Sequence, residues 1–219
     1  MTLTREQSTW IKLLAVAFMI IDHIGLVFFP EEMTWRIIGR LAFPLFAYQL
    51  AVGFEFTSNR RLQLKYLVLF ALISQIPYTL VTGMPWSALH LNIFATFAMA
   101  YAIMMLWARP NKFAFVIALA GFFLILPSTD YGLYGVFLPV GFYLLRKQPV
   151  GQVVLLILAT ALKAYDGSPL QVFAVFSVFV VLIISFIKMP HVHVSKWFFY
   201  WFYPVHLALI AGLAWLLQA

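Results

Sequence analysis

The chain consists largely of apolar runs, many of them about 20 residues long, with short connections between them. A helix needs roughly 20 mostly apolar residues to cross the hydrocarbon core of a bilayer. Nine such runs lie at residues 10–29, 36–56, 62–82, 88–108, 113–127, 132–145, 150–163, 169–187 and 197–217, the fifth to seventh being short for a full crossing. We therefore predict an all-α polytopic membrane protein with about nine transmembrane helices.

Composition excludes the other classes of chain. Of the 219 residues, 64% are hydrophobic and 10% are charged, whereas a soluble domain carries roughly a quarter charged residues. A soluble enzyme, a disordered chain and a fibrous repeat are therefore excluded. Because every connection is short, we expect one transmembrane domain over residues 1–219. The first run has no small-residue cleavage site and holds Asp22 and His23, so we expect it to be retained rather than removed as a signal peptide.

Basic residues alternate along the connections and predict an orientation. With the N-terminus inside, eleven of the fourteen Lys and Arg fall in the N-terminal tail and in segments 59–65, 109–112, 146–147 and 188–196. The other connections hold Glu31, Glu32, Asp130 and Asp166. The positive-inside rule then places the N-terminus inside and the C-terminus outside. We interpret the net charge of +7 as this topology signal and expect no nucleic-acid partner.

Ionisable residues inside the first two runs are the strongest functional signal. A charge at the middle of a span costs about 2.5–3.5 kcal/mol, and such residues usually face the bundle interior. Asp22 and His23 are adjacent in the first run, and Arg36 and Arg40 are one turn apart in the second. Histidine can take and return a proton near neutral pH. Asp22 points about 100° away from His23, so we expect it to pair with a cation on a neighbouring helix, and Pro44 to kink the second span.

Further polar residues share the outer half or the centre of the membrane with these four. They are Gln75, Tyr78, His90, Asn92, Tyr131, Tyr203 and His206. For each one singly, a structural role in joining helices is an alternative. Their common depth predicts one polar pocket that opens outward. His191 and His193 have no third ligand nearby, and the chain has no cysteine, so we expect no metal site.

Six blocks of the sequence together resemble the TraX family, in order and over nearly the whole chain. They are IDHIG at 21–25, RIIGRLAFPLFA at 36–47, ISQIPY at 73–78, LNIF at 91–94, YGLYGV at 131–136 and FYWFYPVH at 199–206. The family is named for an inner-membrane protein that acetylates the N-terminus of F-pilin, and it is related to broader transmembrane acyltransferases.

The resemblance implies an acetyl-CoA-dependent N-acetyltransferase of the bacterial inner membrane. It implies that a membrane-embedded histidine acts as base, that CoA approaches from the cytoplasm, and that the acceptor amine comes from the other side. The family's functional blocks fall on Asp22 and His23, on Arg36 and Arg40, and on Tyr203 and His206. Pilin is one candidate acceptor, because family members also occur outside pilus systems.

The residues suggest how such a reaction would proceed. The phosphates of CoA are expected at the cytoplasmic loops, on Arg60, Arg61, Arg109, Arg146 and Lys147, since charge cannot enter hydrocarbon cheaply. His23 is our choice of base and His206 the alternative. Arg40, Gln75 or Asn92 would bond the developing oxyanion, with Arg36, Tyr78, His90, Tyr131 and Tyr203 contacting the acceptor. Direct transfer and an acetyl-His intermediate remain equally open.

A transporter or channel for a small solute is the competing hypothesis. It would also bury Asp, His and Arg at one depth. A pure assembly scaffold is a third possibility, in which histidine substitutions would have no effect. Binding or hydrolysis of acetyl-CoA would distinguish the enzyme from both.

Overall fold

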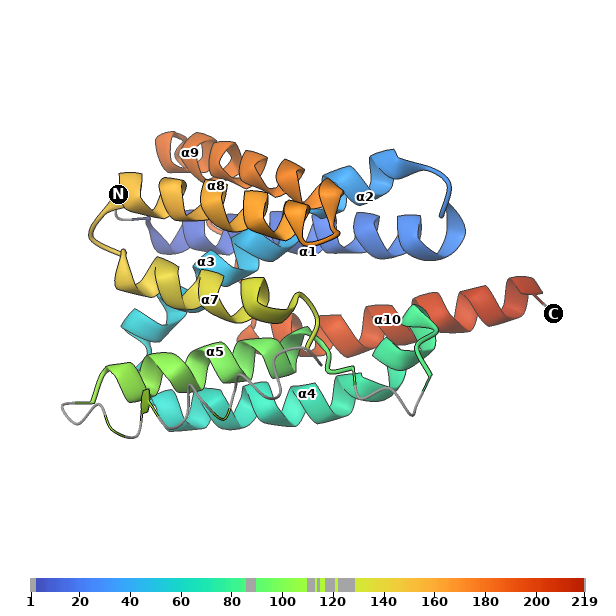
Figure 1. Cartoon of the computed structure of the whole chain (residues 1–219), viewed down its shortest axis with the longest axis horizontal. Helices are drawn as coiled ribbons and strands as arrows, with labels where there is room; N and C mark the ends of the chain where they lie inside the picture. The colour runs from blue at the N-terminus through green and yellow to red at the C-terminus, as the bar shows by residue number, and fades with distance from the viewer. Residues whose placement is uncertain are drawn as a thin grey trace.

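The computed structural model describes residues 3–85, 90–109, 113, 115, 116, 121 and 129–218. Within them the chain is helical apart from short connections. The helices are α1 (Arg5–Phe28), α2 (Met33–Gly39), α3 (Ala42–Phe56), α4 (Arg60–Thr82), α5 (Ile93–Trp107), α7 (Gly132–Leu144), α8 (Pro149–Tyr165), the 3-10 helix η2 (Pro169–Phe176), α9 (Ser177–Phe186) and α10 (Lys196–Gln218). They lie roughly along one direction (Figure 1).

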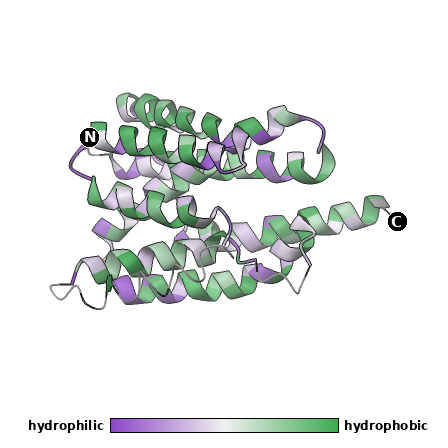
Figure 2. Ribbon diagram, in the orientation of Figure 1, coloured by the Kyte–Doolittle hydropathy of each residue, from purple (hydrophilic) through white to green (hydrophobic). Residues whose placement is uncertain are grey.

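Five segments are long and apolar enough to cross a membrane, which supports the prediction of a polytopic membrane protein. They are Arg5–Phe28, Met33–Phe56, Arg60–Thr82, Pro169–Phe186 and Lys196–Leu217. Three shorter apolar helices are α5, α7 and α8. Figure 2 shows hydrophobic residues along most of the helices and hydrophilic ones concentrated toward their ends. The predicted span 113–127 lies almost wholly outside the described residues, as do Ala88 and Leu89 of the predicted span 88–108. The count of nine spans therefore stays a prediction.

Two of the predicted spans are interrupted rather than continuous. The second is divided into α2 and α3 between Gly39 and Ala42. Pro44 explains the interruption, because proline has no N–H to donate to the carbonyl of Arg40 and its ring crowds that carbonyl. The break thus lies within one turn of Pro44, the residue at which we expected a kink. The span predicted at 169–187 begins as the 3-10 helix η2 and becomes the α-helix α9 at Ser177.

The short helices α5 and α7 pack in the interior, against α3 and α4. α5 is apolar all round, as expected for a fully surrounded helix. The main hydrophobic cluster joins residues of α3, α4, α5, α7, α8 and α10, with Phe54, Phe70, Tyr101 and Leu207 almost completely buried. Large hydrophobic side chains on the outside of α4, α8, α9 and α10 are exposed, as a lipid-facing surface requires.

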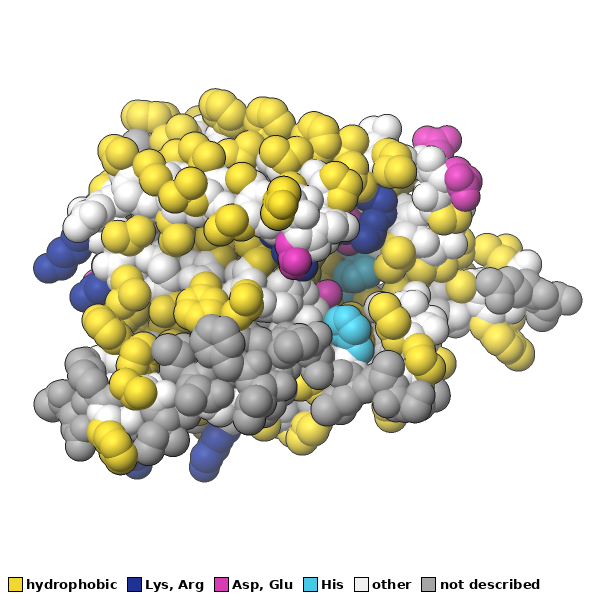
Figure 3. Space-filling view, viewed as in Figure 1, with side chains coloured by type: hydrophobic (Ala, Val, Ile, Leu, Met, Phe, Trp, Pro, Cys, Tyr) yellow, Lys and Arg dark blue, Asp and Glu magenta, His cyan; other side chains and the backbone are white. Residues whose placement is uncertain are grey.

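Charge separates the two ends of the helices. The starts of α1, α4 and α10 carry Arg5, Arg60, Arg61 and Lys196, and Arg146 and Lys147 lie just before α8; we call this the basic end. Glu31 and Glu32 lie in the α1–α2 connection at the opposite end. Figure 3 shows Lys and Arg toward one end of this face, acidic side chains toward the other, and histidine beside acidic and basic groups in a hollow between them.

Candidate functional site

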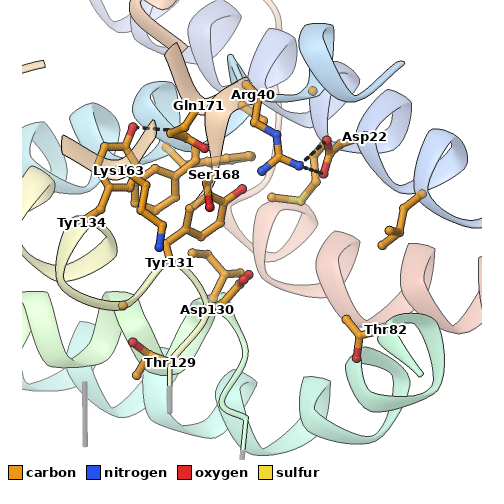
Figure 4. Close-up of a pocket in the computed structure, with 18 of the residues that line it drawn as sticks. Asp22, Arg40, Thr82, Thr129, Asp130, Tyr131, Tyr134, Lys163, Ser168 and Gln171 are labelled. Carbon is orange, nitrogen blue, oxygen red and sulfur yellow. Dashed lines mark hydrogen bonds and ion pairs between the residues drawn. The ribbon is translucent and has the colours of Figure 1, made fainter. Parts of the chain in front are cut away.

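A cavity of about 660 Å³ opens between the helices, away from the basic end. We call it the histidine cavity. Its walls come from α1, α2, α3, α4, α5, α7, α8, η2 and α10. The polar and aromatic residues that line it include Asp22, His23, Arg36, Arg40, Tyr78, His90, Asp130, Tyr131, Lys163, Gln171 and Tyr203. Figure 4 labels six of these, Asp22, Arg40, Asp130, Tyr131, Lys163 and Gln171.

Asp22 is held between two guanidinium groups. Its Oδ2 atom lies 2.8 Å from Nη1 of Arg36, and its Oδ1 atom lies 3.1 Å from Nη2 of Arg40. Arg36 also donates to the backbone carbonyl of Asp22 at 3.1 Å. The prediction that Asp22 pairs with a cation on a neighbouring helix is therefore confirmed. The cluster carries one net positive charge, and charge-assisted bonds of this kind are strong where water is scarce.

Glycines allow α1 and α2 to approach closely enough for these ion pairs. A Cβ atom on Gly39 would overlap the side chain of Asp22, and one on Gly25 would overlap Trp35. The position of the Asp22 carboxylate thus depends on two residues without side chains, on two different helices. Gly25 and Gly39 are positioning residues in this sense, and both lie within the blocks quoted above.

His23 and His206 form a directed hydrogen-bonded pair. Nδ1 of His206 lies 2.9 Å from the carbonyl oxygen of Phe202. A carbonyl only accepts, so this nitrogen carries the proton, and in the neutral ring Nε2 is then an acceptor. That Nε2 lies 3.0 Å from Nδ1 of His23. Nδ1 of His23 must therefore donate, which leaves its Nε2 with a free lone pair.

The two histidines differ in their access to the cavity. His23 lines it, whereas His206 is 8% exposed and stands behind His23, with its ring stacked on Phe202 at 4.3 Å. Tyr203, one turn before His206 on α10, lines the cavity. His206 is therefore placed to orient His23, and His23 to meet a ligand.

The segment before α7 brings a carboxylate into the cavity. The N–H of Asp130 donates to the carbonyl of Leu91 at 2.8 Å, and its carbonyl accepts from Thr96 Oγ1 at 3.2 Å. Tyr131 follows with φ +65°, in the left-handed region that non-glycine residues rarely adopt. Its ring stacks on Phe43 at 4.4 Å between centroids. Such strain gathers at functional sites.

Gln75 and Asn92, predicted as donors to the substrate, bond to each other and to the backbone. Asn92 Nδ2 donates to Gln75 Oε1 at 2.8 Å and to the carbonyl of Ala71 at 2.7 Å. Gln75 Nε2 donates to the carbonyl of His90 at 2.7 Å, and Asn92 Oδ1 accepts from the N–H of Phe94 at the start of α5. Their amides join α4 to α5. Gln75 and Asn92 thus have the structural role in joining helices that we stated as the alternative to a role in the site.

The structure brings eight of the predicted site residues to one cavity. Asp22, His23, Arg36, Arg40, Tyr78, His90, Tyr131 and Tyr203 line it. Tyr78 and His90 contact each other, with the phenolic oxygen 3.3 Å from Nδ1. Gln75, Asn92 and His206 are not among the described lining residues.

A second cavity, of about 630 Å³, opens at the basic end between α1, α3, α4, α5 and α10. We call it the basic cavity. Cations Arg5, Lys12 and Lys196 line it, together with polar Ser8, Gln49 and Gln63. The amide nitrogen of Gln49 is buried without a hydrogen-bond partner among the described residues, while its oxygen accepts from Ser8 Oγ at 2.6 Å.

The two cavities meet beside the histidine pair. Five residues line both: Met19, Phe46, Ile93, Phe97 and Tyr203. Met19 is one turn before His23 on α1, and Tyr203 is one turn before His206 on α10. A thin wall of apolar and aromatic side chains therefore separates a cationic cavity from the base.

The five cations predicted to hold CoA phosphates lie at or near the basic end but outside both cavities, as far as the described lining extends. They are Arg60, Arg61, Arg109, Arg146 and Lys147. Arg60 donates to the carbonyl of Phe54 and covers its ring, and Arg146 pairs with Glu55 at 3.4 Å.

Sequence reasoning missed the cavity residues Asp130, Lys163 and Gln171 and the cations Arg5, Lys12 and Lys196. Asp130 adjoins the YGLYGV block, which was a usable signal. The others have no motif around them. Among the described residues, no group of three His, Asp or Glu side chains could hold a metal ion.

Two known proteins resemble this chain over almost its whole length. Protein TraX of Escherichia coli is 29% identical over 222 residues, covering 95% of this chain and 87% of that protein. A probable fimbrial assembly protein FimC of Dichelobacter nodosus is 26% identical over 235 residues, covering 95% and 96%. An uncharacterized protein of Rickettsia prowazekii is 38% identical over 71 residues, which are 32% of this chain and 27% of that protein. No solved structure matches the chain significantly. The TraX protein family profile matches residues 7–214, and this chain therefore belongs to the TraX family.

Proposed function

We propose that this membrane protein transfers an acetyl group from acetyl-CoA to an amine. Acetyl-CoA binds from the basic end, which faces the cytoplasm of a bacterial cell, and the acceptor enters the histidine cavity from the opposite side of the inner membrane. The observation that carries the proposal is the wall shared by the two cavities, next to a histidine with a free lone pair. A donor and an acceptor can meet there without either crossing the bilayer.

The basic cavity suits the donor. CoA carries roughly 4 negative charges, which remain outside hydrocarbon because their desolvation is costly. Arg5, Lys12 and Lys196 offer counter-charges at that cavity. The pantetheine arm is mostly apolar with two amides, and the unpartnered amide nitrogen of Gln49 provides a donor for an amide carbonyl.

His23 acts as the general base and His206 orients it. The hydrogen bond from His23 Nδ1 to His206 leaves Nε2 of His23 as the atom that accepts the proton. Arg40, at the wall of the same cavity (Figure 4), supplies the positive charge that stabilises the oxyanion.

The reaction balances with these groups alone. The acceptor ammonium loses one proton to water at the open cavity. The neutral amine attacks the thioester carbonyl carbon, and His23 Nε2 takes the second proton as the C–N bond forms. The C–S bond then breaks and His23 returns this proton to the CoA sulfur. The products are an amide and free CoA.

The acceptor is an N-terminal amine of an apolar protein segment. The names of the relatives, a probable fimbrial assembly protein and TraX, support pilin-like subunits as the acceptor class.

The test uses purified protein in proteoliposomes, radiolabelled acetyl-CoA and an apolar pentapeptide amide with a free α-amino group. We expect label transfer to the peptide and a loss of about 10²–10⁴-fold in kcat for His23→Gln, the usual contribution of a general base. The matched control is His193→Gln, an exposed histidine outside both cavities, which should stay within twofold of the unmodified protein.

Two outcomes would overturn the proposal. One is full activity in His23→Gln. The other is an unmodified protein that neither binds nor consumes acetyl-CoA, which, together with solute movement across the vesicle membrane, would favour a transporter.

A further inference from the structure

The carboxylate of Asp130 stands apart from the other two acidic groups of the histidine cavity. Asp22 is paired with two arginines, and Asp166 with Lys163 at 3.3 Å. Asp130 makes no ion pair with any described residue, although it lines the same cavity. Figure 4 shows its side chain directed toward the open centre of the cavity. It is the one carboxylate of the described lining that is available to a cationic ligand.

The backbone around Asp130 fixes this position. Its N–H and carbonyl are bound to Leu91 and Thr96, on either side of the start of α5. The left-handed conformation of Tyr131 then turns the chain into α7. A strained residue costs folding free energy and persists only where the surrounding structure holds it. The strained backbone of Tyr131 therefore indicates that the position of Asp130 is fixed by the fold.

The surroundings suit a primary ammonium on an apolar body. The rings of Tyr78, Tyr131 and Tyr203 line the cavity with Asp130, and aromatic faces attract cations by about 0.5–2 kcal/mol. Arg36 and Arg40 raise the local potential, so a cation can bind only beside a carboxylate that is not already neutralised.

We propose that Asp130 is the residue that binds the acceptor amine in its ammonium form and selects amines over neutral acceptors. The role rests on the proposed acetyl transfer, which it deepens. Asp130 holds the ammonium at the cavity until one proton is lost to water, and the neutral amine then advances to His23. A ligand without an ammonium group leaves the Asp130 carboxylate without an ion-pair partner, so the same contact gives specificity.

The experiment measures binding of the pentapeptide amide in the absence of acetyl-CoA, so it does not depend on catalysis. The competitor is the same peptide without its α-amino group. We expect the unmodified protein to prefer the amine by at least tenfold, and Asp130→Asn to lose that preference by binding the amine peptide more weakly and the des-amino peptide no more weakly than the unmodified protein does. Asp130→Ser repeats the test with a smaller neutral side chain in case Asn is not accommodated.

Asp166→Asn is the matched control, because it removes the same charge from the exposed rim of the same cavity. It should keep the preference within twofold. Equal preference in Asp130→Asn and in the unmodified protein would overturn the inference. An intact amine preference that depends on Asp130, in a protein that never consumes acetyl-CoA, would instead overturn the proposed transfer and leave the ammonium site standing.

Discussion

At position 39 any side chain larger than hydrogen would occupy the space that the Asp22 carboxylate fills. Gly39→Ala should therefore displace Asp22 from Arg36 and Arg40. Disturbing a buried ion pair costs about 3–5 kcal/mol when a partner is lost, so we expect a clear drop in Tm, measured by thermal unfolding in detergent.

Gly212→Ala provides the control for that substitution. Gly212 lies within α10, and no atom of the described residues lies within 4 Å of the place that a Cβ atom would take. There, alanine should raise stability by up to about 1 kcal/mol, since it favours the helix over glycine. Equal Tm values for the two variants would contradict the packing argument.

The proposed role of Asp130 also predicts how binding of the amine peptide depends on pH. Burial raises the pKa of its carboxyl to about 6, against the opposing effect of Arg40. The group is charged above this pH and neutral below it, while an α-amine stays protonated over the same interval. Binding of the amine peptide should therefore weaken as pH falls from 7 to 5.

The pH effect is measured as Kd without acetyl-CoA, so that protonation of a catalytic base does not enter through kcat. The other charged or titratable groups of the described lining of this cavity are Asp22, His23, Arg36, Arg40, Tyr78, His90, Tyr131, Tyr134, Lys163, Asp166 and Tyr203. Asp130→Asn separates their contribution, because its Kd should be flat where that of the unmodified protein rises. Parallel pH curves for the two proteins would contradict the assignment.

Among the elements, the junction of α4 and α5 distinguishes a structural amide from a catalytic one. Asn92→Ala removes the cap of α5 and the two hydrogen bonds that the Asn92 amide donates, to Gln75 Oε1 and to the carbonyl of Ala71. Gln75 Oε1 keeps the hydrogen bond from the backbone N–H of residue 92, at 3.2 Å. A cap alone contributes about 0.5–2 kcal/mol, and each further hydrogen bond that is lost adds about 0.5–1.5 kcal/mol. We expect a large loss of stability with little change in kcat for the folded fraction.

Asn59→Ala is the comparison for this junction. Asn59 caps α4 through one exposed hydrogen bond, to the N–H of Leu62, so its loss should be small. If Asn92→Ala and Asn59→Ala destabilise equally, the amide network between α4 and α5 contributes nothing beyond the cap. If Asn92→Ala instead lowers kcat and leaves Tm unchanged, Asn92 has the catalytic role that we expected from the sequence.

The sequence predicted elements where the signal is local. Apolar length identified the five segments that are long enough to span a membrane, and Pro44 identified the break before α3. The α2–α3 break also explains what could not be predicted: whether Arg36, Arg40 or both would reach Asp22 depends on how two separate helix segments pack. Likewise, nothing local distinguishes Gln75, which joins helices, from Tyr78, which lines the cavity one turn later.

At the scale of the whole molecule, substitutions in the basic cavity test where acetyl-CoA binds. Lys12→Gln and Lys196→Gln should each raise KM for acetyl-CoA about tenfold, because one charge-assisted contact to phosphate contributes roughly 1.5–3 kcal/mol. They should leave KM for S-acetylpantetheine, which lacks the nucleotide and its phosphates, unchanged.

Arg61→Gln and Lys147→Gln, at the same end but outside the described lining of both cavities, are the controls and should shift KM less than twofold. If Arg61→Gln and Lys147→Gln weaken the binding of acetyl-CoA and the Lys12 and Lys196 variants do not, then acetyl-CoA binds at the cytoplasmic loops, as we expected from the sequence. Charge alternation predicted which end is basic, but only packing shows which cations border a cavity. The orientation in the membrane stays a prediction.

The wall between the two cavities consists of Met19, Phe46, Ile93, Phe97 and Tyr203. It determines which part of acetyl-CoA can cross the protein. Under the proposed function, only two carbon atoms and an oxygen pass this barrier of side chains, while the large coenzyme that delivered them is left behind and recycled. A cell could thus acetylate proteins on the outer side of its inner membrane without exporting a nucleotide.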